Sequence, residues 1–116
     1  MKLKSAPLIL CLVLLLTCTS AHALMNTGEL LSICETGLQN PVRDNPKYAF
    51  CTGVMLGILM TDTFERGLIC VPSQVDTSSA MRLFVQRAKR EPHQDIEGFA
   101  TMYRAFLETY PCKKSR

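Results

Sequence analysis

The stretch NPKYAFCTGVMLGILMTDTFERG, residues 45–67, decides the fold class of this 116-residue chain. Asn45 is a favoured N-cap residue, and Pro46 suits the first helical turn because its missing N–H is not needed there. From residue 48 to residue 60 nearly every side chain is apolar, which predicts a helix that its neighbours cover on all sides. Gly67 is a natural place for this helix to end. The stretch therefore predicts an all-α fold.

Two glycines on this helix predict close contact with a second helix. Gly53 and Gly57 lie four residues apart, so they share one face. Each costs up to about 1 kcal/mol relative to alanine in a helix interior. We therefore expect another helix to approach the backbone closely at this face. Paired membrane helices use a similar spacing, but the apolar run here is too short to span a bilayer.

Three more helices are predicted around this one, and no strand. Before it, Asn26 and Glu29 form a capping-box pattern. After it, Asp76 or Thr77 can cap a third helix. The fourth has the clearest helical periodicity, in the residues Phe99, Met102, Tyr103, Phe106, Leu107 and Tyr110. Four helices with short connections predict a small helical bundle.

The N-terminus predicts export. Residues 1–23 combine a basic start, an aliphatic run too short to span a bilayer, and an Ala-x-Ala cleavage site that ends at Ala23. We expect this signal peptide to be removed and residues 24–116 to form one domain in the periplasm, with no membrane segment. A permanent anchor, or lipid attachment at Cys18, fits the pattern less well.

The charge of the mature chain excludes a nucleic-acid binder. The whole chain has 13 Lys and Arg against 10 Asp and Glu. Lys2 and Lys4 leave with the signal peptide, so the net charge falls from +3 to +1. Nucleic-acid binding needs a strong basic excess or a recognisable reading motif, and the sequence has neither.

Four cysteines remain after signal cleavage, and they predict a disulfide framework. An even number of cysteines in a small secreted domain is typical of such crosslinks. Such a small domain also gains more from crosslinks, because its core is limited. The spacing contains no C-x-x-C metal motif, so we expect no metal or cofactor. The four are Cys34, Cys51, Cys70 and Cys112.

Helix geometry favours one pairing. Cys51 lies near the start of the second helix and Cys70 just beyond its end, so they should be roughly 25 Å apart, too far for a disulfide. In an antiparallel hairpin of the first two helices, Cys34 falls opposite Cys51. We favour the pairs Cys34–Cys51 and Cys70–Cys112. The pairs Cys34–Cys70 and Cys51–Cys112 stay open as the alternative.

The sequence contains no catalytic constellation. The cysteines are explained as crosslinks, and no serine lies in a G-x-S-x-G motif. His93 follows a proline in a polar turn and should lie at the surface. Asp62 and Glu65 are three residues apart, as in many solvated carboxylate pairs. These residues predict a protein that is not an enzyme.

Several short motifs occur in an order that resembles a known family. They are Gly28-Glu29-Leu30-Leu31 before Cys34, Cys51-x-Gly53-x-x-x-Gly57, Cys70-Val71-Pro72, a basic helix ending in Glu91-Pro92, and Tyr110-Pro111-Cys112. Over about 28–112 the chain resembles the Rap/Tai family of immunity proteins, small periplasmic proteins associated with type VI secretion. It departs from them in having Val54 where relatives commonly have an aromatic residue.

The resemblance implies an all-helical, disulfide-bonded protein that is often a homodimer. It also implies binding to a cognate toxin, typically a peptidoglycan-cleaving amidase, whose active site the immunity protein covers. The alternative functions are a small periplasmic chaperone of the acid-stress type and a subunit of an envelope complex.

Two polar turns are candidate surfaces for the toxin. The first, at the end of the third helix, contains Arg87, Lys89, Arg90 and His93. The second, between the first two helices, contains Arg43 and Asp44. Each turn projects charge from the end of a rigid helix, so either is suited to enter a cleft.

Overall fold

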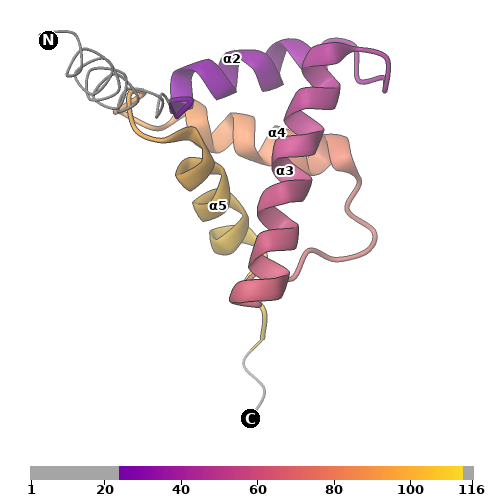
Figure 1. Ribbon diagram of the computed structural model, residues 1–116, viewed down its shortest axis with the longest axis vertical. Coiled ribbons are helices and arrows are strands. Elements are labelled where there is room, and N and C mark those ends of the chain that lie inside the picture. The colour runs from indigo at the N-terminus through magenta and orange to yellow at the C-terminus, as the bar shows by residue number, and fades with distance from the viewer. Residues whose placement is uncertain (1–23, 114–116) are drawn as a thin grey trace, which may run out of the picture.

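The computed structural model describes residues 24–113, so the predicted signal peptide, residues 1–23, lies outside the described residues. The described part contains four helices, α2 (Thr27–Leu38), α3 (Pro46–Glu65), α4 (Thr77–Lys89) and α5 (Gly98–Thr109). Figure 1 shows α2 across the top, α3 running down the front, α4 behind it and α5 to one side. The all-α prediction of about four helices is confirmed.

The helices begin where the sequence predicts. Asn26 caps α2, with its side chain accepting from the N–H of Glu29 at 2.9 Å while the Glu29 carboxylate accepts from the N–H of Asn26 at 3.2 Å. The side chains of Asn45 and Asp76 cap α3 and α4 by accepting from the N–H groups of Lys47 at 3.1 Å and Ser79 at 2.7 Å, without the reciprocal bond. Just beyond α3, Gly67 has a φ of +62°, a left-handed conformation that favours glycine. Within residues 24–113, no helix has both the length and the apolar character needed to cross a bilayer.

The cap of α4 fixes the charge of Asp76. The backbone N–H of Ser79, followed by its hydroxyl, holds the pKa of the Asp76 carboxyl below its ordinary value of 3.8, and Arg82 lowers it further. A lowered pKa in the folded state means that the ionised carboxylate stabilises the fold above pH 3.8. This contribution is lost as the pH falls through the lowered pKa.

Two disulfides join the four cysteines in the pairs favoured from the sequence. Cys34 of α2 is bonded to Cys51 of α3, with their Cα atoms 5.3 Å apart. Cys70, after α3, is bonded to Cys112, after α5, with a Cα separation of 4.8 Å. Loop-closure entropy assigns these crosslinks about 3 and 4 kcal/mol. Both values are large beside the 5–15 kcal/mol or so that stabilises a typical domain.

The helices α2 and α3 cross steeply, which differs from the predicted antiparallel hairpin. Figure 1 shows that they meet only where α2 ends and α3 begins. At this corner a Cβ added to Gly37 would lie 2.8 Å from both the Cα and the N of Tyr48. The two backbones therefore touch at Gly37, and the Cys34–Cys51 disulfide lies beside this contact.

The predicted close approach at the two glycines of α3 is wrong. A Cβ added to Gly53 or Gly57 would meet no atom within 4 Å, and both glycines are exposed. No described helix packs against that face, because α2 and α4 lie against the other side of α3.

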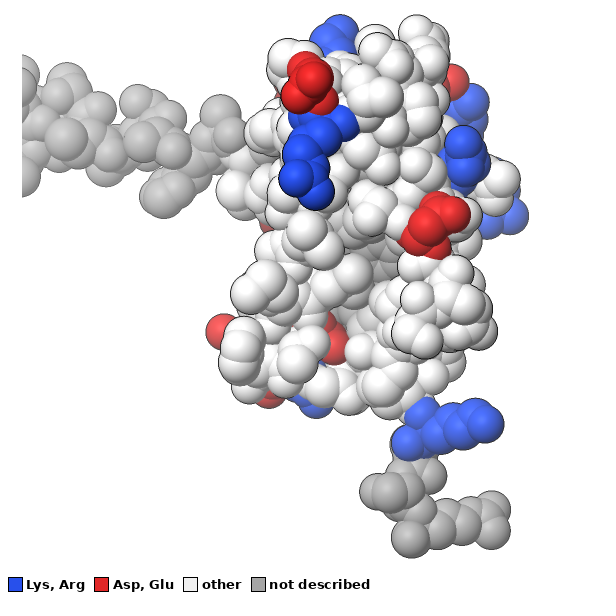
Figure 2. Space-filling view, turned by 90° about the vertical axis from the view of Figure 1, so that its right-hand side faces the viewer, with Lys and Arg blue, Asp and Glu red and all other residues white. Residues whose placement is uncertain are grey.

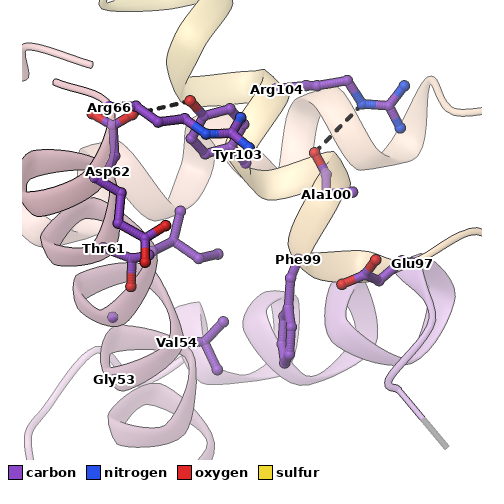
Figure 3. A pocket seen from close by; sticks show the side chains of 13 residues that line it. Gly53, Val54, Thr61, Asp62, Arg66, Glu97, Phe99, Ala100, Tyr103 and Arg104 are labelled. Carbon is purple, nitrogen blue, oxygen red and sulfur yellow. Dashed lines mark hydrogen bonds between the residues drawn. The ribbon is translucent and has the colours of Figure 1, made fainter. Parts of the chain in front are cut away.

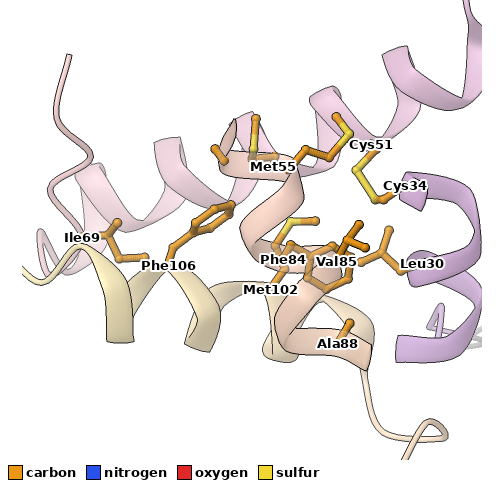
Figure 4. Close-up of a cluster of buried hydrophobic side chains, with 12 residues drawn as sticks. Leu30, Cys34, Cys51, Met55, Ile69, Phe84, Val85, Ala88, Met102 and Phe106 are labelled. Carbon is orange, nitrogen blue, oxygen red and sulfur yellow. A yellow bond between two sulfur atoms is a disulfide. The ribbon is translucent and has the colours of Figure 1, made fainter. Parts of the chain in front are cut away.

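The core is formed by side chains from all four helices (Figure 4). The helix α4 contributes the most residues to the apolar core and lies between α2 and α5, which both contact it. The largest fully buried apolar side chains are Leu30, Met81, Phe84, Met102 and Phe106.

The prediction that neighbours cover α3 on all sides is also wrong. Only three of its 20 residues are buried, namely Cys51, Met55 and Asp62. Apolar side chains on its outer face remain exposed to solvent, and Phe64 is 81% exposed. Figure 2 shows mainly uncharged residues on the lower half of the molecule, with a few acidic and basic atoms among them, and the C-terminal half of α3 lies at this end.

We predict that the substitution Gly37→Ala destabilises the protein by about 1–3 kcal/mol, because the new methyl group overlaps the backbone at Tyr48. Gly28→Ala, on the same helix, is the control, since its methyl group would make only ordinary contacts at 3.4 Å or more. Urea unfolding followed by circular dichroism measures both. Equal stability of the two variants would contradict the close approach at Gly37.

Candidate functional site

A groove of about 590 Å³ opens between α3 and α5 (Figure 3). Its depth beside α3 comes from Gly53 and Gly57, which have no side chains to fill it. Val54 and Phe99 extend toward the open space from the two sides, as Figure 3 shows. The lining is mainly apolar, with four exposed charged residues, Glu65, Arg66, Glu97 and Arg104. A groove of this kind suits an apolar side chain of a partner.

One end of the groove is fixed by a buried carboxylate. Asp62 is 2% exposed. Its Oδ2 accepts hydrogen bonds from the backbone N–H groups of Leu68 at 3.1 Å and Ile69 at 2.8 Å. Its Oδ1 accepts from the hydroxyl of Tyr103 at 3.0 Å. These bonds tie the end of α3 to the following turn and to α5, so Asp62 holds the two walls of the groove together.

The interpretation of Asp62 and Glu65 as a solvated carboxylate pair is wrong for Asp62 and holds for Glu65, which is exposed. The helical spacing contained the signal that was missed. Asp62 follows Cys51 and Met55 at positions i+11 and i+7, so it lies on the buried face. Both of its oxygens already accept hydrogen bonds within the fold, which gives it a structural role. Among residues 24–113, no group of three or more His, Cys, Asp or Glu is placed to hold a metal ion.

The basic residues predicted at the end of α4 are already partly engaged within the molecule. Arg87 forms ion pairs with Glu91 at 3.4 Å and Glu108 at 3.3 Å, and its side chain is 23% exposed. The Lys89 ammonium lies 2.7 Å from a carboxylate oxygen of Glu35, in an exposed pair. Surface pairs of this kind contribute about 0–1 kcal/mol, so they leave Lys89 able to exchange partners.

The other predicted contact residues are exposed, and they lie at two separate places. Arg90 and His93 lie at the surface in the α4–α5 turn, which contacts the beginning of α2 through the Asn26–Glu97 bridge. Arg43 and Asp44 are exposed in the α2–α3 turn, at the other end of α2 (Figure 1). The length of α2, about 18 Å at 1.5 Å per residue, separates the two turns. The structure therefore presents two distinct surfaces.

Comparison with known proteins identifies the family. A family model described as Rap1a immunity proteins matches residues 26–112. The chain belongs to the Rap1a immunity protein family. The matched range contains all four helices and both disulfides, and it confirms the resemblance to the Rap/Tai proteins. Neither the curated proteins nor the solved structures gave a match. Membership of the Rap1a family implies a role in immunity to a toxin, through binding of that toxin, and the family is generally non-enzymatic.

We predict that Tyr103→Phe destabilises this Rap1a protein by about 1 kcal/mol, because it removes one hydrogen bond to Asp62. Asp62→Ala should lower the free energy of unfolding further, by about 1–3 kcal/mol, because it leaves the backbone N–H of the buried Ile69 without an acceptor. Glu65→Ala is the matched control and should stay within about 0.5 kcal/mol of the original protein. Chemical denaturation measures all three, and an Asp62→Ala variant as stable as the control would refute the structural role.

Proposed function

We propose that this Rap1a protein neutralises a cognate toxin in the periplasm by binding over the toxin's active site. The family match across residues 26–112 carries the proposal. The toxin that we propose is a peptidoglycan-cleaving amidase delivered by type VI secretion. Because such an enzyme attacks the cell wall from the periplasm, its inhibitor must be in the same compartment.

The sequence features of exported proteins support the periplasmic location. Residues 1–23 have the pattern of a cleavable signal peptide. The two disulfides fit the same location, since disulfides form and persist in oxidising compartments such as the periplasm.

Inhibition by occlusion requires a rigid surface and no chemistry from the inhibitor. A surface that is already ordered loses little conformational entropy on binding, which favours affinity. Both candidate turns start from helix ends that are fixed in place, one by Cys34–Cys51 and the other by the buried Ala88, whose carbonyl accepts a hydrogen bond from the Gln94 side chain at 2.9 Å. The protein is, in this proposal, a non-enzymatic inhibitor. It acts as a homodimer, a state that the uncovered apolar face of α3 favours.

The direct test is protection of living cells. If a peptidoglycan amidase is encoded beside the gene for this protein, a bacterium that exports that amidase to its periplasm should lyse unless it also produces this protein. A chain that lacks residues 1–23 should fail to protect, because it stays in the cytoplasm. The proposal fails if the intact chain accumulates in the periplasm and the cells still lyse.

We predict that the charge reversals Lys89→Glu and Arg90→Glu together raise the dissociation constant for the toxin by at least about tenfold. The melting temperature should stay unchanged, because both side chains are exposed. Arg87 is left intact, since its two ion pairs give it a structural role.

The matched control reverses both charges in the other turn, Arg43→Glu with Asp44→Lys. Isothermal titration calorimetry measures each affinity. If the Lys89→Glu and Arg90→Glu variant binds with unaltered affinity and the Arg43→Glu and Asp44→Lys variant binds more weakly, the binding surface is the α2–α3 turn and not the α4–α5 turn.

A further inference from the structure

The outer face of α3 carries a helix-pairing pattern that no described helix uses. Five positions follow one another at alternating spacings of three and four residues, which is the repeat by which two helices pack along their length. They are Phe50, Gly53, Gly57, Met60 and Phe64, and we name them the outer seam. All five are exposed, with Phe50 at 44%, Met60 at 58% and Phe64 at 81%.

We infer that the outer seam pairs with the outer seam of a second copy of this chain, with the two α3 helices antiparallel. This inference rests on the homodimer proposed above and not on the identity of the toxin. A two-fold axis between residues 58 and 59 places Phe64 opposite Gly53 of the other copy. The same axis places Met60 opposite Gly57.

The sizes of the facing side chains argue for a second copy as the partner. In this single register Met60 and Phe64 each meet a glycine of the seam, and a Cβ at either glycine would have open space around it. Phe50 falls opposite position 67, beyond the end of α3. Every contact occurs twice, as a two-fold interface requires. The seam thus supplies both its own protruding side chains and the spaces that receive them. Binding of a different protein would not require the large and small residues of this one helix to complement each other.

The groove between α3 and α5 gives Phe64 of the partner a place to enter. Gly53 lies on the α3 side of this groove, with Val54 beside it and Phe99 across from it (Figure 3). The Phe64 ring of one copy faces Gly53 of the other copy. It would therefore pack between Val54 and Phe99 of that other copy. This contact would cover the most exposed apolar residue of α3.

Charge and area are also compatible with self-association. The exposed part of α3 between Phe50 and Phe64 contains no charged residue, because Asp62 is buried. With about 150–250 Å² for a whole aromatic side chain, the exposed portions of Phe50, Leu56, Met60, Phe64 and Leu68 amount to roughly 500 Å² per copy. A standard interface buries about 800 Å² per partner, of which the rim is polar. The apolar face is large enough to be the centre of such an interface.

The first experiment blocks the seam at a position where the single copy has room. Gly53→Leu should raise the dissociation constant of the dimer about a hundredfold, because the overlap with Phe64 occurs twice. Gln86→Leu, on the exposed side of α4, adds the same side chain elsewhere and should leave the dimer intact. Sedimentation equilibrium of the full, oxidised protein without toxin measures association, and circular dichroism verifies that the helices are retained.

The second experiment tests the register. Adding Phe64→Ala to Gly53→Leu should restore the dimer to within about tenfold of the original affinity, since the new leucine then meets a small residue. Adding Met60→Ala instead should not restore it. A protein that is monomeric at all concentrations, a dimer that Gly53→Leu leaves intact, or equal rescue by both second substitutions would each overturn the inference.

Failure here is separable from failure of the proposed function. If the free protein is monomeric and Gly53→Leu weakens toxin binding, the outer seam belongs to the toxin interface. The inference is then rejected while the immunity role stands. If the dimer forms as described but cells are not protected, the immunity role is rejected and the dimer stands.

Discussion

Covalent attachment at both ends of α3 is the constraint on which the rest of the structure depends. Cys51, in the second turn of α3, is bonded to α2, and Cys70, just past its end, is bonded to Cys112 after α5. These two bonds, with the buried carboxylate of Asp62, fix the helix against the core. Because so few residues of α3 need to be buried, its other face stays exposed to solvent.

This division suits the periplasmic inhibitor that we propose. A domain of this size buries a modest share of its surface, so crosslinks supply stability that the core alone would not. An inhibitor also gains affinity when its contact surface is ordered before binding. The α4–α5 turn and the α2–α3 turn meet that condition at opposite ends of α2, while the outer seam lies on a third part of the surface.

Local features of the fold were predictable from the sequence, and the covering of α3 was not. Caps at Asn26 and Asn45 depend on a few neighbouring residues, so their patterns identify them reliably. In contrast, α3 is apolar on almost every face, so its sequence does not indicate which face packs against the core. For the same reason the glycines were assigned to an internal contact, while the close contact in the structure is at Gly37. Asp62 was missed although its spacing from Cys51 placed it inward. The toxin-contacting residues stay predictions, because they depend on a partner surface.

Methionine oxidation tests most directly whether the outer face of α3 is free of its own chain. In protein diluted far below the dissociation constant of the proposed dimer and treated with hydrogen peroxide, Met60, which is 58% exposed in the single copy, should be oxidised at nearly the rate of free methionine. Met81 and Met102, both at 0% exposure, should be oxidised far more slowly while the protein stays folded. Mass spectrometry of the peptides gives all three rates. A Met60 that is oxidised as slowly as Met102 would mean that the chain covers this face itself.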